Sequence, residues 1–112
     1  MKISKDFKKL TDQKRWELIS EYISESGEFY SIRGVKYTAK LGDNKIIYTG
    51  NTKGTRRSIQ EEILHKGDVL SAIRAIEDKE NINTSTIKHF VKQIYRQRSP
   101  FIGLLKSADI LK

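Results

Sequence analysis

The sequence predicts an α+β fold: an N-terminal helix, a central antiparallel β-hairpin and a C-terminal group of short helices. Near both ends of the chain, apolar residues recur at the spacing of a helix that buries one face. Between these regions, apolar and polar residues alternate, which is typical of a half-buried strand. The length of 112 residues fits one domain, over residues 1–112, and leaves no room for a second core.

Residues 5–26 are expected to form one broken helix or two consecutive helices. Thr11 or Asp12 provides a side-chain oxygen that caps a helix N-terminus, and Gly27 stands where glycine commonly ends a helix. The apolar residues at helical spacing after this cap are Trp16, Ile19, Tyr22 and Ile23. The segment is therefore expected to contribute to the core.

The middle of the chain carries the pattern of a β-hairpin. Apolar and polar residues alternate over residues 35–41, a turn cluster follows at 42–44, and a second β-rich run covers 45–49. If Leu41 pairs with Ile46, the apolar face continues across both strands. The opposite face would present Lys36, Thr38, Lys40, Ile47 and Thr49. We expect one face of the hairpin to pack and the other to be basic.

Two short helices are expected after the hairpin. Residues 58–61 read Ser-Ile-Gln-Glu and match a capping box, which predicts a helix that ends near Lys66-Gly67. Asp68 is expected to cap the next helix. The apolar residues on the inner face of that helix are Val69, Leu70, Ile73 and Ile76.

Two further helices are expected towards the C-terminus. Thr84 or Ser85 can cap the first of them, and Ser99-Pro100 places a cap and a proline at the start of the second. Their apolar residues are Ile87, Phe90, Val91 and Ile94, and then Phe101, Leu104 and Leu105. No internal repeat is visible.

The charge of the chain predicts a polyanionic partner. The formal net charge is +8, from 22 Lys and Arg against 14 Asp and Glu. Residues 28–60 and 84–112 each carry a net charge of +5, and residues 61–83 between them carry −3. A surplus of this kind favours nucleic acid, acidic proteins or anionic surfaces. We expect DNA as the partner, and RNA is an open alternative.

The composition also limits the compartment and the cofactors. The chain has no cysteine, so disulfides and thiolate metal sites are excluded. Charged residues occupy the N-terminus where a signal peptide needs an apolar stretch, and no apolar run is long enough to cross a membrane. We expect a cytoplasmic protein without a membrane segment. His65 and His89 have no partners at metal-ligand spacing, so no metal or other cofactor is predicted.

The loop over residues 50–57 is the first candidate nucleic-acid contact. Its glycines let backbone N–H groups approach an anion, and Lys53, Arg56 and Arg57 supply charge at the same place. The spacing of a P-loop is absent. The alternative is an exposed turn that the charges keep solvated. Together with the hairpin residues Lys36, Lys40 and Lys45, the loop is expected to lie along phosphates.

The helices expected at about 69–80 and 85–97 are the second candidate. Two helices joined by a short turn form a helix-turn-helix, or part of a winged-helix-like domain, in which the second helix enters the major groove. The residues that this helix would present are Thr86, Lys88, His89, Lys92, Arg96 and Arg98. A domain of this kind commonly acts as a homodimer. The alternative is that the second helix only packs against the core.

Two stretches with glycine and tyrosine lie in the hairpin, Gly34-Val35-Lys36-Tyr37 and Tyr48-Thr49-Gly50, with Arg56-Arg57 downstream. This arrangement, which covers residues 34–57, resembles the opening of the GIY-YIG endonucleases. The resemblance implies that both tyrosines and an arginine act around the scissile phosphate, and that a glutamate on a later helix holds a metal ion. Lys36 splits the first motif, Thr49 replaces the middle residue of the second, and Glu61 and Glu62 come earlier than the expected glutamate. Tyrosines that pack in the core are the alternative.

Three functions therefore stand open. The leading one is a small, non-enzymatic DNA-binding protein, such as a regulator or accessory factor. The first alternative is a protein-interaction module, an inhibitor or assembly factor that binds an acidic partner or uses its own acidic segment 61–83 as a docking surface. The second alternative is an endonuclease related to the GIY-YIG family.

Overall fold

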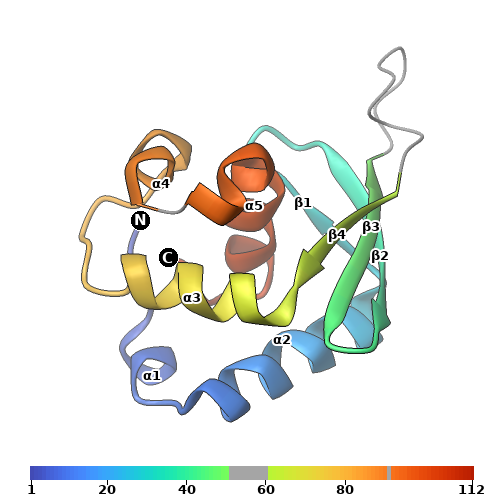
Figure 1. Ribbon diagram of the computed structural model, residues 1–112, viewed down its shortest axis with the longest axis horizontal. Coiled ribbons are helices and arrows are strands. Elements are labelled where there is room, and N and C mark those ends of the chain that lie inside the picture. Colours follow the sequence, from blue (N-terminus) through green and yellow to red (C-terminus); the bar gives the residue numbers. More distant parts are fainter. Residues whose placement is uncertain (51–60, 91) are drawn as a thin grey trace.

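The computed structural model describes residues 1–50, 61–90 and 92–112 and confirms the α+β class (Figure 1). Within these residues, a four-stranded antiparallel sheet has the strand order β1-β2-β3-β4. The elements are α1 (Lys5–Lys8), α2 (Asp12–Ser26), β1 (Glu28–Tyr30), β2 (Lys36–Gly42), β3 (Lys45–Gly50), β4 (Glu62–His65), α3 (Lys66–Ile76), α4 (Thr84–Phe90), the 3-10 helix η2 (Lys92–Gln97) and α5 (Arg98–Ser107). In the described ranges, no helix is both long enough and apolar enough to cross a bilayer.

The N-terminal region forms two consecutive helices, as one of the two sequence readings predicts. The Thr11 hydroxyl accepts a hydrogen bond from the Lys14 backbone N–H at 3.2 Å, so Thr11 caps α2. Gly27 ends α2 in the left-handed conformation, with φ at 66°, and its N–H donates to the Ile23 carbonyl. A glycine adopts this conformation without the steric penalty of a side chain.

The β2–β3 hairpin has the predicted register. Leu41 pairs with Ile46, and the two-residue turn between Gly42 and Lys45 places Asn44 in the left-handed region with φ at 54°. Asparagine tolerates that conformation better than most residues. Ile46 is buried, whereas Leu41 is 37% exposed, so the apolar face of the hairpin ends before its turn.

The prediction of a helix that ends near Lys66-Gly67 is wrong, because the described residues of that segment form strand β4 (Glu62–His65). Residues 58–60 lie outside them, and β4 pairs with β3 in an antiparallel register in which Ile63 faces Ile47. This register buries Leu64 against the core, which outweighs the local capping pattern. Helix α3 then starts at Lys66, with His65 rather than Asp68 at its cap position. Its four predicted inner-face residues are all buried.

The predicted continuous helix over residues 85–97 is also wrong. Helix α4 ends at Phe90, and residues 92–97 form a 3-10 helix. The side chain that bonds to the first turn of α4 is Asn83, whose Oδ1 accepts from the Thr86 N–H at 2.9 Å. Residues 77–83 separate α3 from α4, and this connection is longer than the turn of a helix-turn-helix. The helix-turn-helix and winged-helix arrangements are therefore not confirmed.

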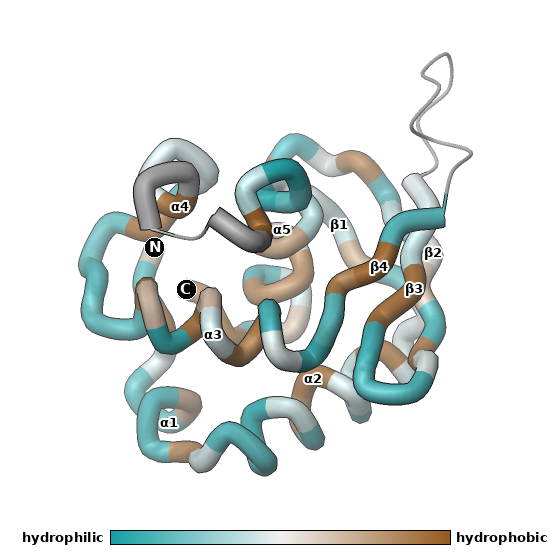
Figure 2. The backbone as a smooth tube through the Cα atoms, viewed as in Figure 1, coloured by the Kyte–Doolittle hydropathy of each residue, from teal (hydrophilic) through white to brown (hydrophobic). Residues whose placement is uncertain are grey.

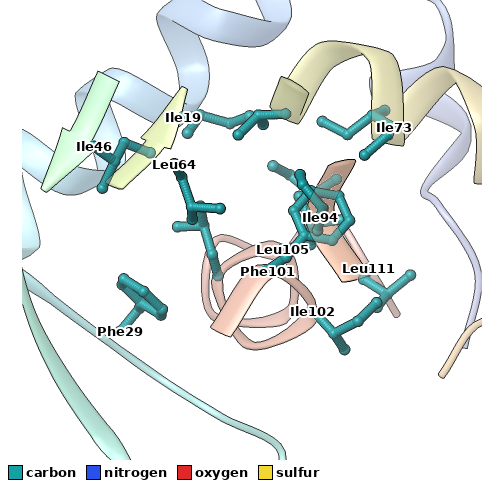
Figure 3. Packing of buried hydrophobic residues seen from close by; sticks show 14 of the residues in the cluster. Ile19, Phe29, Ile46, Leu64, Ile73, Ile94, Phe101, Ile102, Leu105 and Leu111 are labelled. Atoms are coloured by element: carbon teal, nitrogen blue, oxygen red, sulfur yellow. The ribbon is translucent and has the colours of Figure 1, made fainter. Parts of the chain in front are cut away.

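Helix α5 forms the centre of the core. The predicted start at Ser99-Pro100 falls within its first turn, and its residues from Pro100 to Leu105 are all buried. In Figure 2 the ends of its tube are hydrophilic and its middle is pale to brown. Figure 3 shows Phe101 and Leu105 of α5 in the same buried cluster as Ile73 of α3 and Leu64 of β4. Six consecutive buried residues cover every side of a helix, which is typical of a central position.

The two edges of the sheet are covered by the C-terminal elements. At the β1 edge, the Ser107 hydroxyl bonds to both backbone groups of Tyr30, accepting from the N–H at 3.0 Å and donating to the carbonyl at 3.3 Å. At the β4 edge, the Gln97 side chain donates to the Ile63 carbonyl at 2.7 Å. These bonds satisfy backbone groups that an exposed edge would offer to another strand.

A partly buried ion pair joins the N-terminal helices to α3. A nitrogen of the Arg15 guanidinium lies 2.8 Å from a carboxylate oxygen of Glu77, and a second nitrogen donates to the Lys8 carbonyl. The Arg15 side chain is 5% exposed, so it depends on these partners. An antiparallel β-bridge between Ile3 and Leu111 joins the two terminal segments.

Gly103→Ala is expected to destabilise the fold, although alanine is the better helix former. A Cβ at Gly103 would lie 2.7 Å from Ser31 Cα and would also meet the Tyr30 carbonyl, so α5 would have to move away from β1. We expect a loss of about 2 kcal/mol or more in the free energy of unfolding, measured by urea denaturation.

Gly67→Ala is the matched control, because Gly67 also lies in a helix and a Cβ there would contact nothing within 4 Å. It is expected to be neutral or to stabilise by up to about 1 kcal/mol. Equal effects of the two substitutions would show that the close approach of α5 to β1 does not matter for stability.

Candidate nucleic-acid interface

One face of the sheet points away from the helices, and we call it the outer face. Paired residues in an antiparallel sheet share a face, so the register defines its members. They are Glu28, Tyr30, Lys36, Thr38, Lys40, Lys45, Ile47, Thr49, Ile63 and His65. The residues that alternate with them include the buried Phe29, Ala39, Ile46, Tyr48 and Leu64. Figure 1 shows α3 and α5 on one side of the strands and the hairpin at the periphery of the molecule.

The three predicted hairpin lysines lie on this outer face. Lys36 Nζ is 3.0 Å from Glu28 Oε2 on the neighbouring strand, and Lys40 Nζ is 3.9 Å from Glu61 Oε1. The hydrogen bond between Lys36 and Glu28 raises the pKa of the lysine and lowers that of the glutamate. Lys45 has no ion-pair partner in the described part of the chain. The face thus carries three lysines, two of which form solvent-exposed ion pairs with Glu28 and Glu61.

An exposed aromatic corner lies at the β1 side of the outer face, and the sequence did not suggest it. Tyr30 is 43% exposed, stands opposite Lys36, and donates its hydroxyl to Glu28 at 3.2 Å. The following turn exposes Ile32 and Arg33. The only signal in the sequence is that Tyr30 and the buried Phe29 are adjacent, which places them on opposite faces if they lie in a strand.

The loop residues Lys53, Arg56 and Arg57 lie outside the described residues, and so do the side chains of Lys88, His89 and Lys92. Thr86 is described, and its hydroxyl donates to the Asn81 carbonyl at 2.9 Å. This bond fixes the start of α4, which gives Thr86 a structural role.

The predicted arginines of the C-terminal region lie in η2 and at the start of α5. Arg96 is exposed, whereas Arg98 donates to the Tyr95 carbonyl at 2.8 Å and lies 4.5 Å from the centre of the Tyr95 ring. Gln97, between them, is bonded to β4, so both arginines lie near the β4 edge of the sheet. Helix α4 lies towards the opposite end of the long axis from the hairpin (Figure 1). Among the described residues, the hairpin lysines therefore lie on β2 and β3, whereas Arg96 and Arg98 lie in η2 and at the start of α5.

A polar network on the inner face joins the sheet to η2. The Tyr48 hydroxyl donates to Glu62 Oε2 at 2.7 Å and accepts from Gln97 Nε2 at 2.9 Å. The remaining Gln97 amide hydrogen is used by the Ile63 carbonyl. Burial raises the pKa of Tyr48 far above its ordinary value, the hydrogen bond to Glu62 adds to this, and the bond from Gln97 opposes it. Tyr48 therefore remains a protonated donor at neutral pH.

The two tyrosines of the nuclease-like motif are close together. The rings of Tyr37 and Tyr48 meet edge to face with their centres 5.6 Å apart, and Phe29 contacts both. Tyr48 is 2% exposed, and its hydroxyl partners are protein groups. Glu62 reaches Tyr48 from a strand, not from a later helix as the resemblance implies. Among the described residues, no three acidic or histidine side chains gather as metal ligands.

The acidic segment 61–83 does not form one surface either. Glu61 pairs with Lys40 on the outer face, Glu62 bonds to the buried Tyr48, and Glu77 pairs with Arg15. Three of its carboxylates thus serve contacts within the fold.

Comparison of the chain with known protein families, curated proteins and solved structures identified no relative. No family model matches the chain, and no curated protein or solved structure is significantly similar to it. The GIY-YIG resemblance thus depends on the motif residues alone, and a function has to be argued from the geometry of the chain.

Tyr48→Phe is expected to change how stability depends on alkaline pH. Above about pH 10 the tyrosine ionises in the unfolded chain, whereas the buried tyrosine of the folded protein keeps its proton. The free energy of unfolding of the wild-type protein therefore falls by up to about 1.4 kcal/mol per pH unit because of this group. The variant lacks this loss. At pH 8 it is expected to be less stable by about 1–3 kcal/mol, because Glu62 and Gln97 lose a partner.

The measurement is urea denaturation of both proteins at pH 8, 10 and 11. The difference in free energy of unfolding between them should narrow above pH 10. A difference that stays constant over this range would contradict the buried, protonated state of Tyr48.

Proposed function

We propose that this chain is a non-enzymatic nucleic-acid-binding protein that uses the outer face of its sheet, with DNA as the expected ligand. The observation that carries the proposal is the position of Lys36, Lys40 and Lys45, which share the sheet face opposite the one that buries Ala39, Ile46 and Tyr48. A regulator or an accessory factor would both fit such a surface.

The ion pairs on this face are compatible with binding. Lys40 and Glu61 are both more than half exposed, and exposed pairs of this kind contribute little to stability in water. A phosphate of a nucleic-acid backbone can therefore replace Glu61 as the partner of Lys40 with little loss of stability. Neutralising several phosphates also releases counterions, which makes binding favourable and dependent on salt.

The spacing of the charges favours a polyanion over a single acidic group. Lys36 and Lys40 lie four residues apart on the same strand, which corresponds to roughly 13 Å. Lys45 stands on the next strand, near the turn. A ligand that bears charges at intervals can reach all three lysines, whereas one carboxylate reaches only one.

Lys40→Glu is expected to weaken nucleic-acid binding at least fivefold at 50 mM salt, because the substitution removes one phosphate contact and adds repulsion. Fluorescence anisotropy with labelled DNA and RNA oligonucleotides at 50 and 200 mM salt measures both the affinity and its salt dependence.

Lys14→Glu is the matched control. Its side chain is 66% exposed and lies 3.4 Å from Glu17, so its environment resembles that of Lys40, which is 68% exposed. Lys14 lies on α2, away from the outer face, and its reversal should change affinity less than twofold. Equal losses in both variants would mean that only net charge matters and would overturn the assignment of the outer face.

An endonuclease is the second candidate, favoured by the contact between the Tyr37 and Tyr48 rings and by Glu62 beside Tyr48. Incubation with supercoiled plasmid and magnesium tests it. Glu62→Gln keeps an oxygen for the Tyr48 hydroxyl but removes the carboxylate, so it should abolish nicking and leave DNA binding unchanged. Absence of nicking by the wild-type protein would remove this candidate.

A further inference from the structure

We infer that the outer face binds single-stranded nucleic acid in preference to duplex, with a base stacked on Tyr30. The inference rests on the proposed nucleic-acid binding and specifies the class of ligand. Three features of the described residues support it: the width of the sheet, the covered edges, and the aromatic corner at β1.

The sheet is too wide to enter a duplex groove. Four strands at the usual separation span about 14 Å between the outermost backbones. The major groove of B-DNA is about 12 Å wide and admits a helix or a two-stranded ribbon, and the minor groove is about half as wide. Helix α5 covers the β1 edge and η2 lies at the β4 edge, which broadens the obstacle. The lysines of the outer face can therefore reach a duplex only along its exterior.

A single strand can lie flat on such a face. Its unstacked bases expose their aromatic faces, and these can stack on exposed aromatic side chains of a sheet. Lys36 and Lys40 follow one strand, which sets a line of positive charge beside Tyr30. Ile47 and Ile63 are paired neighbours further across the face and add apolar surface.

Tyr30 is held in place before any ligand arrives. Both of its backbone groups bond to the Ser107 hydroxyl, and its own hydroxyl donates to Glu28. The adjacent turn is also fixed, since the Ser31 hydroxyl accepts from the Val35 N–H at 3.0 Å. A ring that is already ordered loses little conformational entropy on binding, which favours affinity.

The corner around Tyr30 combines the groups that a nucleotide requires. Arg33 is exposed in the turn, Lys36 stands directly opposite Tyr30, and Ile32 is 44% exposed. A phosphate can meet Arg33 or Lys36 while the neighbouring base covers the ring. The acidic Glu28 also lies at this corner of the outer face, and it is paired with Lys36.

The test uses fluorescence anisotropy with a labelled 20-nucleotide oligothymidylate, the corresponding oligouridylate and a 20-base-pair duplex, at 50 mM salt. The wild-type protein should bind at least one single strand tenfold more tightly than the duplex. Tyr30→Leu should weaken single-strand binding about fivefold or more, because it removes the stacking surface. Tyr30→Phe keeps that surface and should stay within twofold of wild type. Circular dichroism checks that both variants fold.

The outcomes separate this inference from the proposed function. If the duplex binds as tightly as both single strands and Lys40→Glu weakens all of them while Tyr30→Leu weakens none, the single-strand inference is overturned and nucleic-acid binding by the outer face stands. If no oligonucleotide binds at 50 mM salt, both are overturned. If Tyr30→Phe loses as much affinity as Tyr30→Leu, the hydroxyl and not the stacking ring is responsible, and the inference fails.

Discussion

The close approach of α5 to β1 is the contact on which the rest of the structure depends. Gly103 has no side chain, so the helix lies directly against the backbone of Tyr30 and Ser31. Ser107, one turn further, bonds to both backbone groups of Tyr30. This docking holds α5, whose residues from Pro100 to Leu105 are all buried, in a position where β1, η2 and α4 pack against it. A larger residue at 103 would move α5 outwards and open the core.

The position of α5 also makes the sheet one-sided. The residues that the structure buries lie on its inner face, whereas most residues of the outer face are exposed to solvent. Because Ser107 and Gln97 satisfy edge groups of β1 and β4, the sheet offers little for strand addition by another chain. The nucleic-acid binding that we propose thus uses side chains on the open face, which are mainly lysine, threonine, isoleucine and tyrosine.

The tyrosines of the hairpin illustrate how one motif supports two interpretations. Their spacing resembles that of a nuclease, and the fold does bring the rings of Tyr37 and Tyr48 together. In this fold, however, Tyr48 is part of a buried network with Glu62 and Gln97 that connects β3, β4 and η2. A buried hydroxyl needs such partners, so the network is explained by the stability of the fold without any chemistry. Glu62 and Gln97 are distant from Tyr48 in the sequence, so the sequence did not predict that both would bond to its hydroxyl.

The sequence by itself determined the features that depend on near neighbours. The alternation of apolar and polar residues predicted the register of the β2–β3 hairpin and placed the lysines of residues 36–45 on one face. Thr11 and Gly27 determined the two ends of α2. Only the tertiary structure decided the rest, because those choices depend on residues far apart in the chain. Pairing with β3 made residues 62–65 a strand in spite of a helical cap pattern, and the backbone of β1 determined that residue 103 must be glycine. The open face of the sheet likewise exists because the helices share the other side, and no local pattern records which face that is.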